Sequence, residues 1–80
     1  MRILLVGAGG VGSAVVPIAA RRHFFETVVV ADYDRDRAER AVAQVDDPRF
    51  VAAQVDASNA EAVVGLVREH AITHVLNAVD

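Results

Sequence analysis

The stretch ILLVGAGGVG, residues 3–12, decides the fold that this 80-residue sequence predicts. Four apolar residues, Ile3 to Val6, lead into a cluster of glycines, a pattern typical of a strand buried on both faces of a parallel sheet. Apolar residues at helical spacing follow, from Val11 to Ala19. A strand, a glycine-rich turn and a helix are therefore expected to open the chain.

The same alternation of strand and helix continues to the end of the sequence. Residues 27–31, 50–55 and 74–79 predict strands, and residues 34–45 and 58–70 predict helices. Asp34 is expected to cap the second helix, and the Ser58-x-x-Glu61 spacing predicts a capping box for the third. Pro17 falls inside the first helix, where it removes the amide that would bond to the Ser13 carbonyl.

Strands and helices that alternate with short connections predict the α/β class, here a Rossmann-like doubly wound parallel sheet with strand order 3-2-1-4. In that order the first two helices share one face of the sheet and the third covers the other. The fourth strand is left as a bare edge, because a full domain adds further strands beside it. We therefore interpret residues 1–80 as the N-terminal part of a dinucleotide-binding domain. The remainder of that domain and a substrate domain are expected to lie outside this sequence.

Composition and charge exclude several classes of protein. The chain is 54% hydrophobic and 24% charged, which favours a folded domain over a disordered segment. A net charge of −3 argues against nucleic-acid binding. The absence of cysteine and the spacing of the three histidines predict no metal site. Because the apolar opening is too short for a signal peptide or a membrane helix, we expect a cytoplasmic protein without membrane contact.

The spacing Gly7-x-Gly9-x-x-Gly12 is the main chemical clue in the sequence. Gly7 allows a tight turn after the strand, Gly9 lets the backbone approach a pyrophosphate, and Gly12 lets the helix pack near the strand. The amides of Gly10, Val11 and Gly12 would then point at the phosphates, with the positive end of the helix dipole behind them. The motif is specific only in context, and here it follows a strand and opens a helix.

Asp32 completes this context, because it ends the second strand twenty residues after Gly12. Its carboxylate can accept hydrogen bonds from both hydroxyls of the adenosine ribose. A 2′-phosphate about 4 Å from that carboxylate would be repelled by roughly 4 kcal/mol per charge pair at an effective dielectric near 20, so NAD is favoured over NADP. Arg35 either offsets this repulsion by gripping a phosphate or is a solvated residue of the first helical turn.

Two further polar residues follow strands and have two interpretations each. Asp56, after the third strand, either contacts the adenine or is a loop residue that precedes the Ser58 cap. Asn77, near the end of the fourth strand, either bonds to the ribose or phosphate of the cofactor or satisfies loop backbone. No pair of nucleophile and base is visible, so the sequence predicts no catalytic residue.

Three stretches together resemble the N-terminal NAD(P)-binding region of saccharopine dehydrogenase-like oxidoreductases. They are MRILLVGAGGVGSAVVPIAARR (1–22), VVVADYDRDRAE (28–39) and QVDASNAEAVVGLVREHAITHVLNAVD (54–80). The most telling parts are GAGGVG, Ala31-Asp32, Val55-Asp56 and Leu76-Asn77-Ala78. The resemblance implies hydride transfer between a nicotinamide cofactor and an amino-acid-derived amine or imine.

The resemblance also implies roles for individual residues. The diphosphate would lie on the glycine turn and the adenosine ribose on Asp32, with Tyr33 flanking the adenine. Asp56 and Ala57 would lie near the adenine, and Asn77 and Ala78 near the ribose or nicotinamide. The acid and base groups of the family lie in its later substrate domain, which would also bind most of the amino-acid-like substrate. We expect the full protein to form homo-oligomers.

The alternative is a regulatory nucleotide-sensing Rossmann module, such as the domains that control potassium conductance. Those modules also contain a glycine turn, a strand that ends in an acid and a stretch like Asp56-Ala57-Ser58. The segment Ile72–Ala78 favours the dehydrogenases, because Asn77 suits a site that presents a nicotinamide for reaction. The sequence after residue 80 would separate the two hypotheses.

Overall fold

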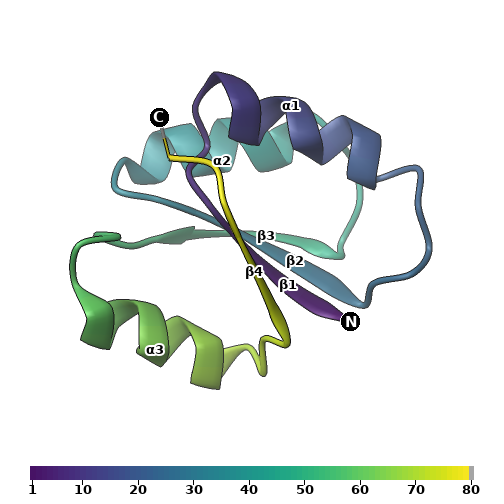
Figure 1. The fold of residues 1–80 in the computed structure, drawn as a ribbon. Helices are drawn as coiled ribbons and strands as arrows, with labels where there is room; N and C mark the ends of the chain where they lie inside the picture. Colours follow the sequence, from purple (N-terminus) through teal and green to yellow (C-terminus); the bar gives the residue numbers. More distant parts are fainter. Residues whose placement is uncertain (80) are drawn as a thin grey trace.

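A computed structural model describes residues 1–79 as four strands and three helices that alternate along the chain. In chain order they are β1 (Arg2–Val6), α1 (Gly10–Ala19), β2 (Thr27–Asp32), α2 (Arg35–Ala43), β3 (Phe50–Gln54), α3 (Ala60–Glu69) and β4 (His74–Asn77). Figure 1 shows the sheet as the middle layer, with α1 and α2 on one side and α3 on the other.

The four strands form one parallel sheet in the order β3-β2-β1-β4. Leu4 in the middle of β1 pairs with Val29 of β2 on one side and with Val75 of β4 on the other. The predicted α/β class, the strand order 3-2-1-4 and the division of the helices between the two faces are all confirmed.

Alternating side chains of the two central strands fill two cores. Ile3 and Leu5 of β1 and Val28 of β2 belong to the core under α1 and α2, whereas Leu4 and Val29 belong to the core that α3 covers. Because successive side chains of a strand point to opposite faces, a strand that is apolar throughout can serve both cores at once. The continuous apolar runs that mark these strands in the sequence follow from this arrangement.

Two of the helices begin with side-chain caps. The Asp34 carboxylate accepts hydrogen bonds from the amides of Asp36 and Arg37, as the sequence predicts. The prediction for α3 is wrong by one residue, because Asn59 and not Ser58 caps it, accepting from the Ala62 amide at 3.1 Å. The Ser58 hydroxyl donates instead to Asp56 at 2.6 Å.

The outer strands are shorter than the sequence predicts. β3 ends at Gln54, opposite Asp32, and β4 ends at Asn77, opposite Val6. Pairing stops at these positions because the neighbouring central strands end there. The carboxyl ends of the strands therefore lie at one edge of the sheet, beside the turn that leaves β1.

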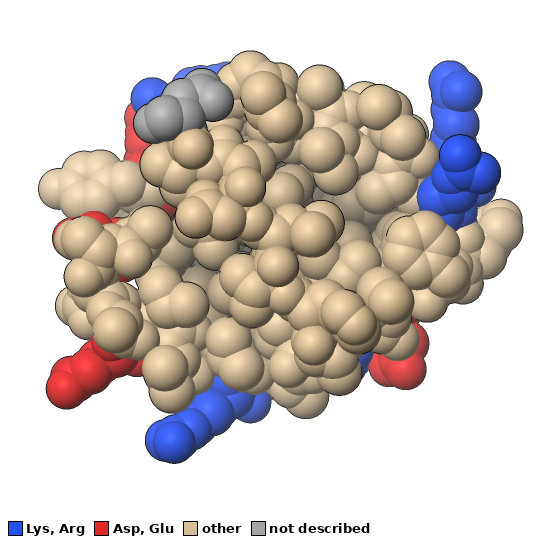
Figure 2. Space-filling model, viewed as in Figure 1, with Lys and Arg blue, Asp and Glu red and all other residues tan. Residues whose placement is uncertain are grey.

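All four residues of β4 are exposed, in contrast to the fully buried β2. Val75 is 52% exposed and Leu76 48%, and Phe24 beyond the end of α1 is 61% exposed. Figure 2 shows that uncharged residues cover most of the face around β4, with charged side chains at its rim. The strand thus exposes two large apolar side chains, Val75 and Leu76, on a surface that residues 1–79 leave open. None of the helices within residues 1–79 has the length and hydropathy to cross a membrane.

Candidate functional site

Two glycines at the turn between β1 and α1 occupy positions where a side chain would not fit. Gly7 has a φ of +103°, and a Cβ there would lie 2.8 Å from the carbonyl carbon of Ala78. A Cβ on Gly12 would overlap the carbonyl oxygen of Gly7. Because both positions exclude a side chain, the first turn of α1 lies directly against the end of β1, as the spacing of the glycines predicts.

The amino end of α1 differs from those of the other two helices of residues 1–79. Its N-cap is Gly9, which makes no side-chain hydrogen bond to the helix. The amides of Gly10, Val11 and Gly12 have no acceptor within residues 1–79. Unpaired amides at the positive end of a helix dipole bind anions such as phosphate, so this turn suits the diphosphate that its sequence predicts.

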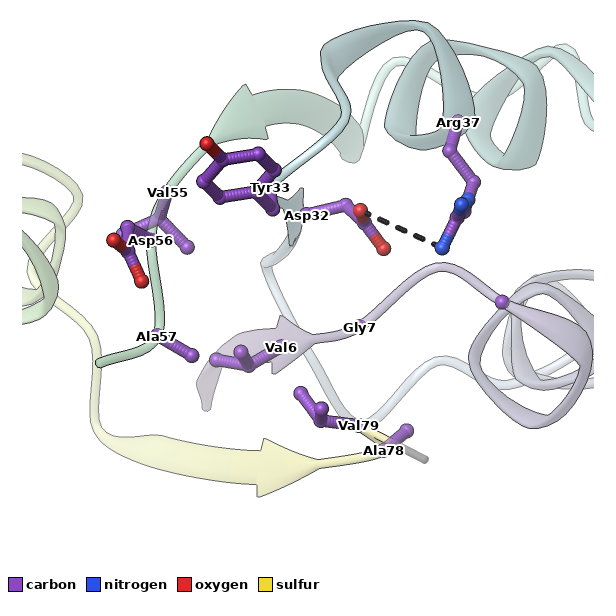
Figure 3. A pocket seen from close by; sticks show the side chains of 11 residues that line it. Val6, Gly7, Asp32, Tyr33, Arg37, Val55, Asp56, Ala57, Ala78 and Val79 are labelled. Atoms are coloured by element: carbon purple, nitrogen blue, oxygen red, sulfur yellow. Dashed lines mark ion pairs between the residues drawn. The ribbon is translucent and has the colours of Figure 1, made fainter. Parts of the chain in front are cut away.

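Asp32 ends β2 beside this turn. Its carboxylate accepts hydrogen bonds from the glycine turn and from the residue before α2, and it forms an ion pair with α2. Oδ2 accepts a hydrogen bond from the Ala8 amide at 2.7 Å, and Oδ1 accepts one from the Asp34 amide at 2.8 Å. Nη1 of Arg37 lies 3.9 Å from Oδ1, an ion pair that Figure 3 marks with a dashed line. Each carboxylate oxygen keeps capacity for a further donor, such as a ribose hydroxyl.

These contacts decide the charge of Asp32, which is only 8% exposed. Burial alone raises the pKa of a carboxyl group, but the Ala8 and Asp34 amides and the Arg37 guanidinium lower it further than burial raises it. The pKa of Asp32 is therefore below its ordinary value, and the group is an anion at neutral pH. It joins the glycine turn to β2 and is also a negatively charged acceptor in the site.

A cavity of about 320 Å³ lies at the carboxyl ends of β1, β2 and β3. Its walls are Val6, Gly7, Gly9, Asp32, Tyr33, Arg37, Val55, Asp56, Ala57, Ala78 and Val79. Figure 3 shows Tyr33 and Asp56 toward one end of the cavity and Asp32 with Arg37 toward α2. In open α/β sheets, ligands bind in a crevice of this kind, outside the carboxyl ends of the strands.

Seven of the twelve residues predicted from the sequence line this cavity: Gly7, Gly9, Asp32, Tyr33, Asp56, Ala57 and Ala78. Tyr33 is 73% exposed, which leaves its ring free to contact a planar group. The Asp56 carboxylate accepts from the Ser58 amide and hydroxyl, and these bonds hold its pKa below the ordinary value. Asp56 is thus both a wall of the cavity and the acceptor that orders the following loop.

Asn77 lies outside the cavity walls. Its Oδ1 accepts a hydrogen bond from the Val79 amide at 3.0 Å, which is the loop-backbone interpretation of this residue. Gly10, Val11 and Gly12 are also outside the walls. Their unpaired amides lie in the first turn of α1, next to Gly9 of the cavity wall.

The structure shows Arg35 as the solvated residue of the first helical turn, the second of its two interpretations. Arg35 is the first residue of α2 and pairs with Glu39 at 3.0 Å along the outside of the helix. Arg37, two residues later, turns back toward Asp32 and lines the cavity. Two helical residues point in directions about 200° apart, so only one arginine of this pair can face the site. Sequence reasoning also missed three apolar walls, Val6, Val55 and Val79, whose pattern does not differ from that of core residues.

The parallel sheet, the glycine-rich turn and the buried acid at the end of β2 define a Rossmann-type dinucleotide-binding domain. Residues 3–80 match the family described as the saccharopine dehydrogenase NADP binding domain. The chain belongs to this family, which confirms the resemblance that the sequence indicates.

A solved structure of quinate dehydrogenase from Corynebacterium glutamicum in complex with NAD is similar to this chain, with a TM-score of 0.68 and 28% sequence identity. The match covers 98% of this chain and 26% of that chain, so the chain spans about a quarter of the length of its structural relative. The family and this relative indicate the NAD(P)-binding domain of an oxidoreductase, with a nicotinamide dinucleotide as the cofactor. The regulatory potassium-linked module is correspondingly disfavoured.

Proposed function

We propose that this chain holds the cofactor for an oxidoreductase that transfers a hydride between a nicotinamide and an amino-acid-derived amine or imine. The observation that carries the proposal is that the free amino end of α1 lies beside the buried Asp32 carboxylate, at a cavity lined by Gly7, Gly9 and Asp32. The terminus supplies donors for phosphate, and the carboxylate supplies acceptors for ribose hydroxyls. The bound nicotinamide ring would donate or accept the hydride.

The proposed contacts follow the order of the cofactor's parts. The diphosphate lies on the turn from Gly7 to Gly12, at the amides of Gly10 and Val11. The adenosine ribose bonds to Asp32, and the adenine lies between Tyr33 and the Asp56-Ala57 segment. Ala78 and the neighbouring Asn77 lie on the path toward the nicotinamide.

Asp32 and Arg37 bear on the choice between NAD and NADP in opposite directions. A 2′-phosphate about 4 Å from the Asp32 carboxylate is repelled by roughly 4 kcal/mol per charge pair, because the site is only partly screened by water. Arg37, which is half-exposed and 3.9 Å from Asp32, attracts the same phosphate. Since Asp32 is the more buried of the two and its charge is held by two amides, we propose that NAD binds more tightly, by about tenfold or more.

The substrate has two candidates. Membership of the saccharopine dehydrogenase family supports an amine-linked amino acid and its imine. The similar solved structure is a quinate dehydrogenase, which supports instead a hydroxy acid that is oxidised at a hydroxyl group. Because residues 1–79 provide the cofactor side of the site, the groups that choose between these substrates are proposed to lie in another domain.

We further propose that residues 1–80 are the N-terminal part of the cofactor domain and that additional chain covers β4. The exposed apolar residues Val75 and Leu76 support this, because a parallel strand is ordinarily covered on both faces. We also propose that the full protein forms homo-oligomers.

Calorimetric titration of the purified protein with NAD and with NADP tests the cofactor proposal. We expect saturable binding of both, with the lower dissociation constant for NAD, and binding of neither would overturn the proposal. Absorbance of NADH, measured on the full-length enzyme that includes the substrate domain, then distinguishes the substrates, because amino acids support its formation under the first hypothesis and hydroxy acids under the second. Formation of NADH with hydroxy acids alone would replace the amine substrate by the second candidate.

A further inference from the structure

Pro17 creates a defect in α1 that a side chain of another helix repairs. In an unbroken helix the Ser13 carbonyl would accept from the amide of residue 17, which proline lacks. Instead, Nε2 of Gln44 donates to the Ser13 carbonyl at 2.8 Å. The same nitrogen donates to the Ala41 carbonyl at 2.9 Å, in the last turn of α2. Gln44, the C-cap of α2, therefore joins the two helices that share one face of the sheet.

The bond reaches α1 at the turn that carries the free amides. Ser13 follows Gly12 directly, and its own amide donates to Gly9 at 2.8 Å. Ser13 and Gln44 also line a hollow of about 230 Å³ whose other walls include Ala8 and Arg37. Ala8 donates to Asp32, and Arg37 is a wall of the cofactor cavity. Gln44 thus lies directly behind the proposed binding site.

We propose that Gln44 is a positioning residue for the cofactor. It would fix the first turn of α1, and with it the amides for the diphosphate, relative to the β2–α2 unit that carries Asp32 and Arg37. The two halves of the site come from separate strand–helix units, so their spacing depends on contacts between α1 and α2. This inference rests on the proposed function, since it concerns the affinity for the same dinucleotide.

Pro17 provides an internal test of this role. Pro17→Ala returns an amide to position 17, and this amide can donate to the Ser13 carbonyl in place of Gln44. The effect of Gln44→Ala should therefore be large in the natural background and small in the Pro17→Ala background. Such non-additivity is expected of residues that share one partner.

The experiment measures the dissociation constant of NAD by calorimetry for the unsubstituted protein, the two single variants and the double variant. We expect Gln44→Ala to raise the dissociation constant by about three- to tenfold and to lower the melting temperature by about 2–8 °C, the shift expected for one lost hydrogen bond in a domain of this size. In the Pro17→Ala background the same substitution should change the dissociation constant by less than about twofold. Binding is measured well below the melting temperature, where all four proteins are folded.

Thr27→Val is the matched control, because the Thr27 hydroxyl donates only to the Arg49 carbonyl, at the amino end of β2 and away from the site. It should lower the melting temperature similarly and leave NAD affinity unchanged. Equal weakening by Thr27→Val, an unchanged affinity in Gln44→Ala, or equal effects of Gln44→Ala in both backgrounds would overturn the inference. Absence of NAD binding by the unsubstituted protein would refute the proposed function itself, and the inference with it.

Discussion

Asp32→Asn is the most informative single substitution, because Asp32 has contacts with both the glycine turn and the proposed ribose site. The carboxylate accepts from the Ala8 amide at 2.7 Å and from the Asp34 amide at 2.8 Å. An asparagine has one accepting oxygen and one donating nitrogen, so one of the two amides must face a donor. Ala8 is 2% exposed, and water cannot readily replace the lost acceptor there.

The expected magnitude follows from these contacts. A hydrogen bond to a charged group contributes about 1.5–3 kcal/mol, and an unsatisfied buried donor adds to its loss. We expect the variant to lose about 2–3 kcal/mol in the free energy of unfolding, measured by urea denaturation. The dissociation constant of NAD should rise about 10- to 100-fold, because the ribose loses a charged acceptor. Affinity for NADP should fall much less, since the repulsion of its 2′-phosphate is also removed.

The pH dependence provides a second measurement on the same variant. The pKa of Asp32 is lowered in the folded state, so its stabilisation is fully present above the ordinary pKa of about 3.9 and is lost as the pH falls through the lower folded value. The unsubstituted protein should therefore lose stability below about pH 4 more steeply than Asp32→Asn. Asp46→Asn, at an exposed position, controls for the change in net charge. An Asp32→Asn protein with unchanged stability and unchanged NAD affinity would refute this reasoning.

Three further substitutions test the site and the helix ends. Arg37→Ala should raise the dissociation constant of NADP about 5- to 20-fold and change that of NAD by less than about twofold, because a guanidinium beside Asp32 would contact the 2′-phosphate alone. Arg35→Ala is the control for calorimetry, and an equal effect of both variants would contradict the assignment of Arg37. Ala71→Gly should raise the free energy of unfolding by about 0.5–1 kcal/mol, because Ala71 has a φ of +53° after α3, where glycine avoids the left-handed strain. Gly65→Ala should also stabilise the protein, by up to about 1 kcal/mol, since a Cβ there meets no atom within 4 Å and alanine favours the helix. Urea denaturation measures both, and a loss of stability in either variant would show that its backbone reasoning is wrong.

The fold could be predicted from the sequence because its determinants are local. The apolar run of β1, the glycine-rich turn at Gly7 and the Asp34 cap are each visible in a few consecutive residues, and together they indicate one fold. Strand order then followed from the preferences of parallel sheets, which restrict the topologies open to alternating strands and helices. The bare edge of β4 followed from the same order.

The sequence misassigned a role or left it open where neighbouring residues compete for it. Ser58 and Asn59 are both good caps, and only the contact of Ser58 with Asp56 decides between them. Arg35 and Arg37 are both near Asp32 in sequence, and the phase of α2 decides which one faces it. The contact of Gln44 with Ser13 joins residues 31 positions apart, which no local pattern indicates.

The bond between Asp32 and the Ala8 amide has a consequence for redesign of cofactor preference. Exchanging the acid for a neutral residue, the obvious way to admit a phosphorylated ribose, would also release the backbone of the turn that is proposed to bind the diphosphate. The preference for NAD over NADP and the order of the glycine turn thus depend on the same side chain. An engineered switch would need a new acceptor for that amide, introduced in the same step as the exchange.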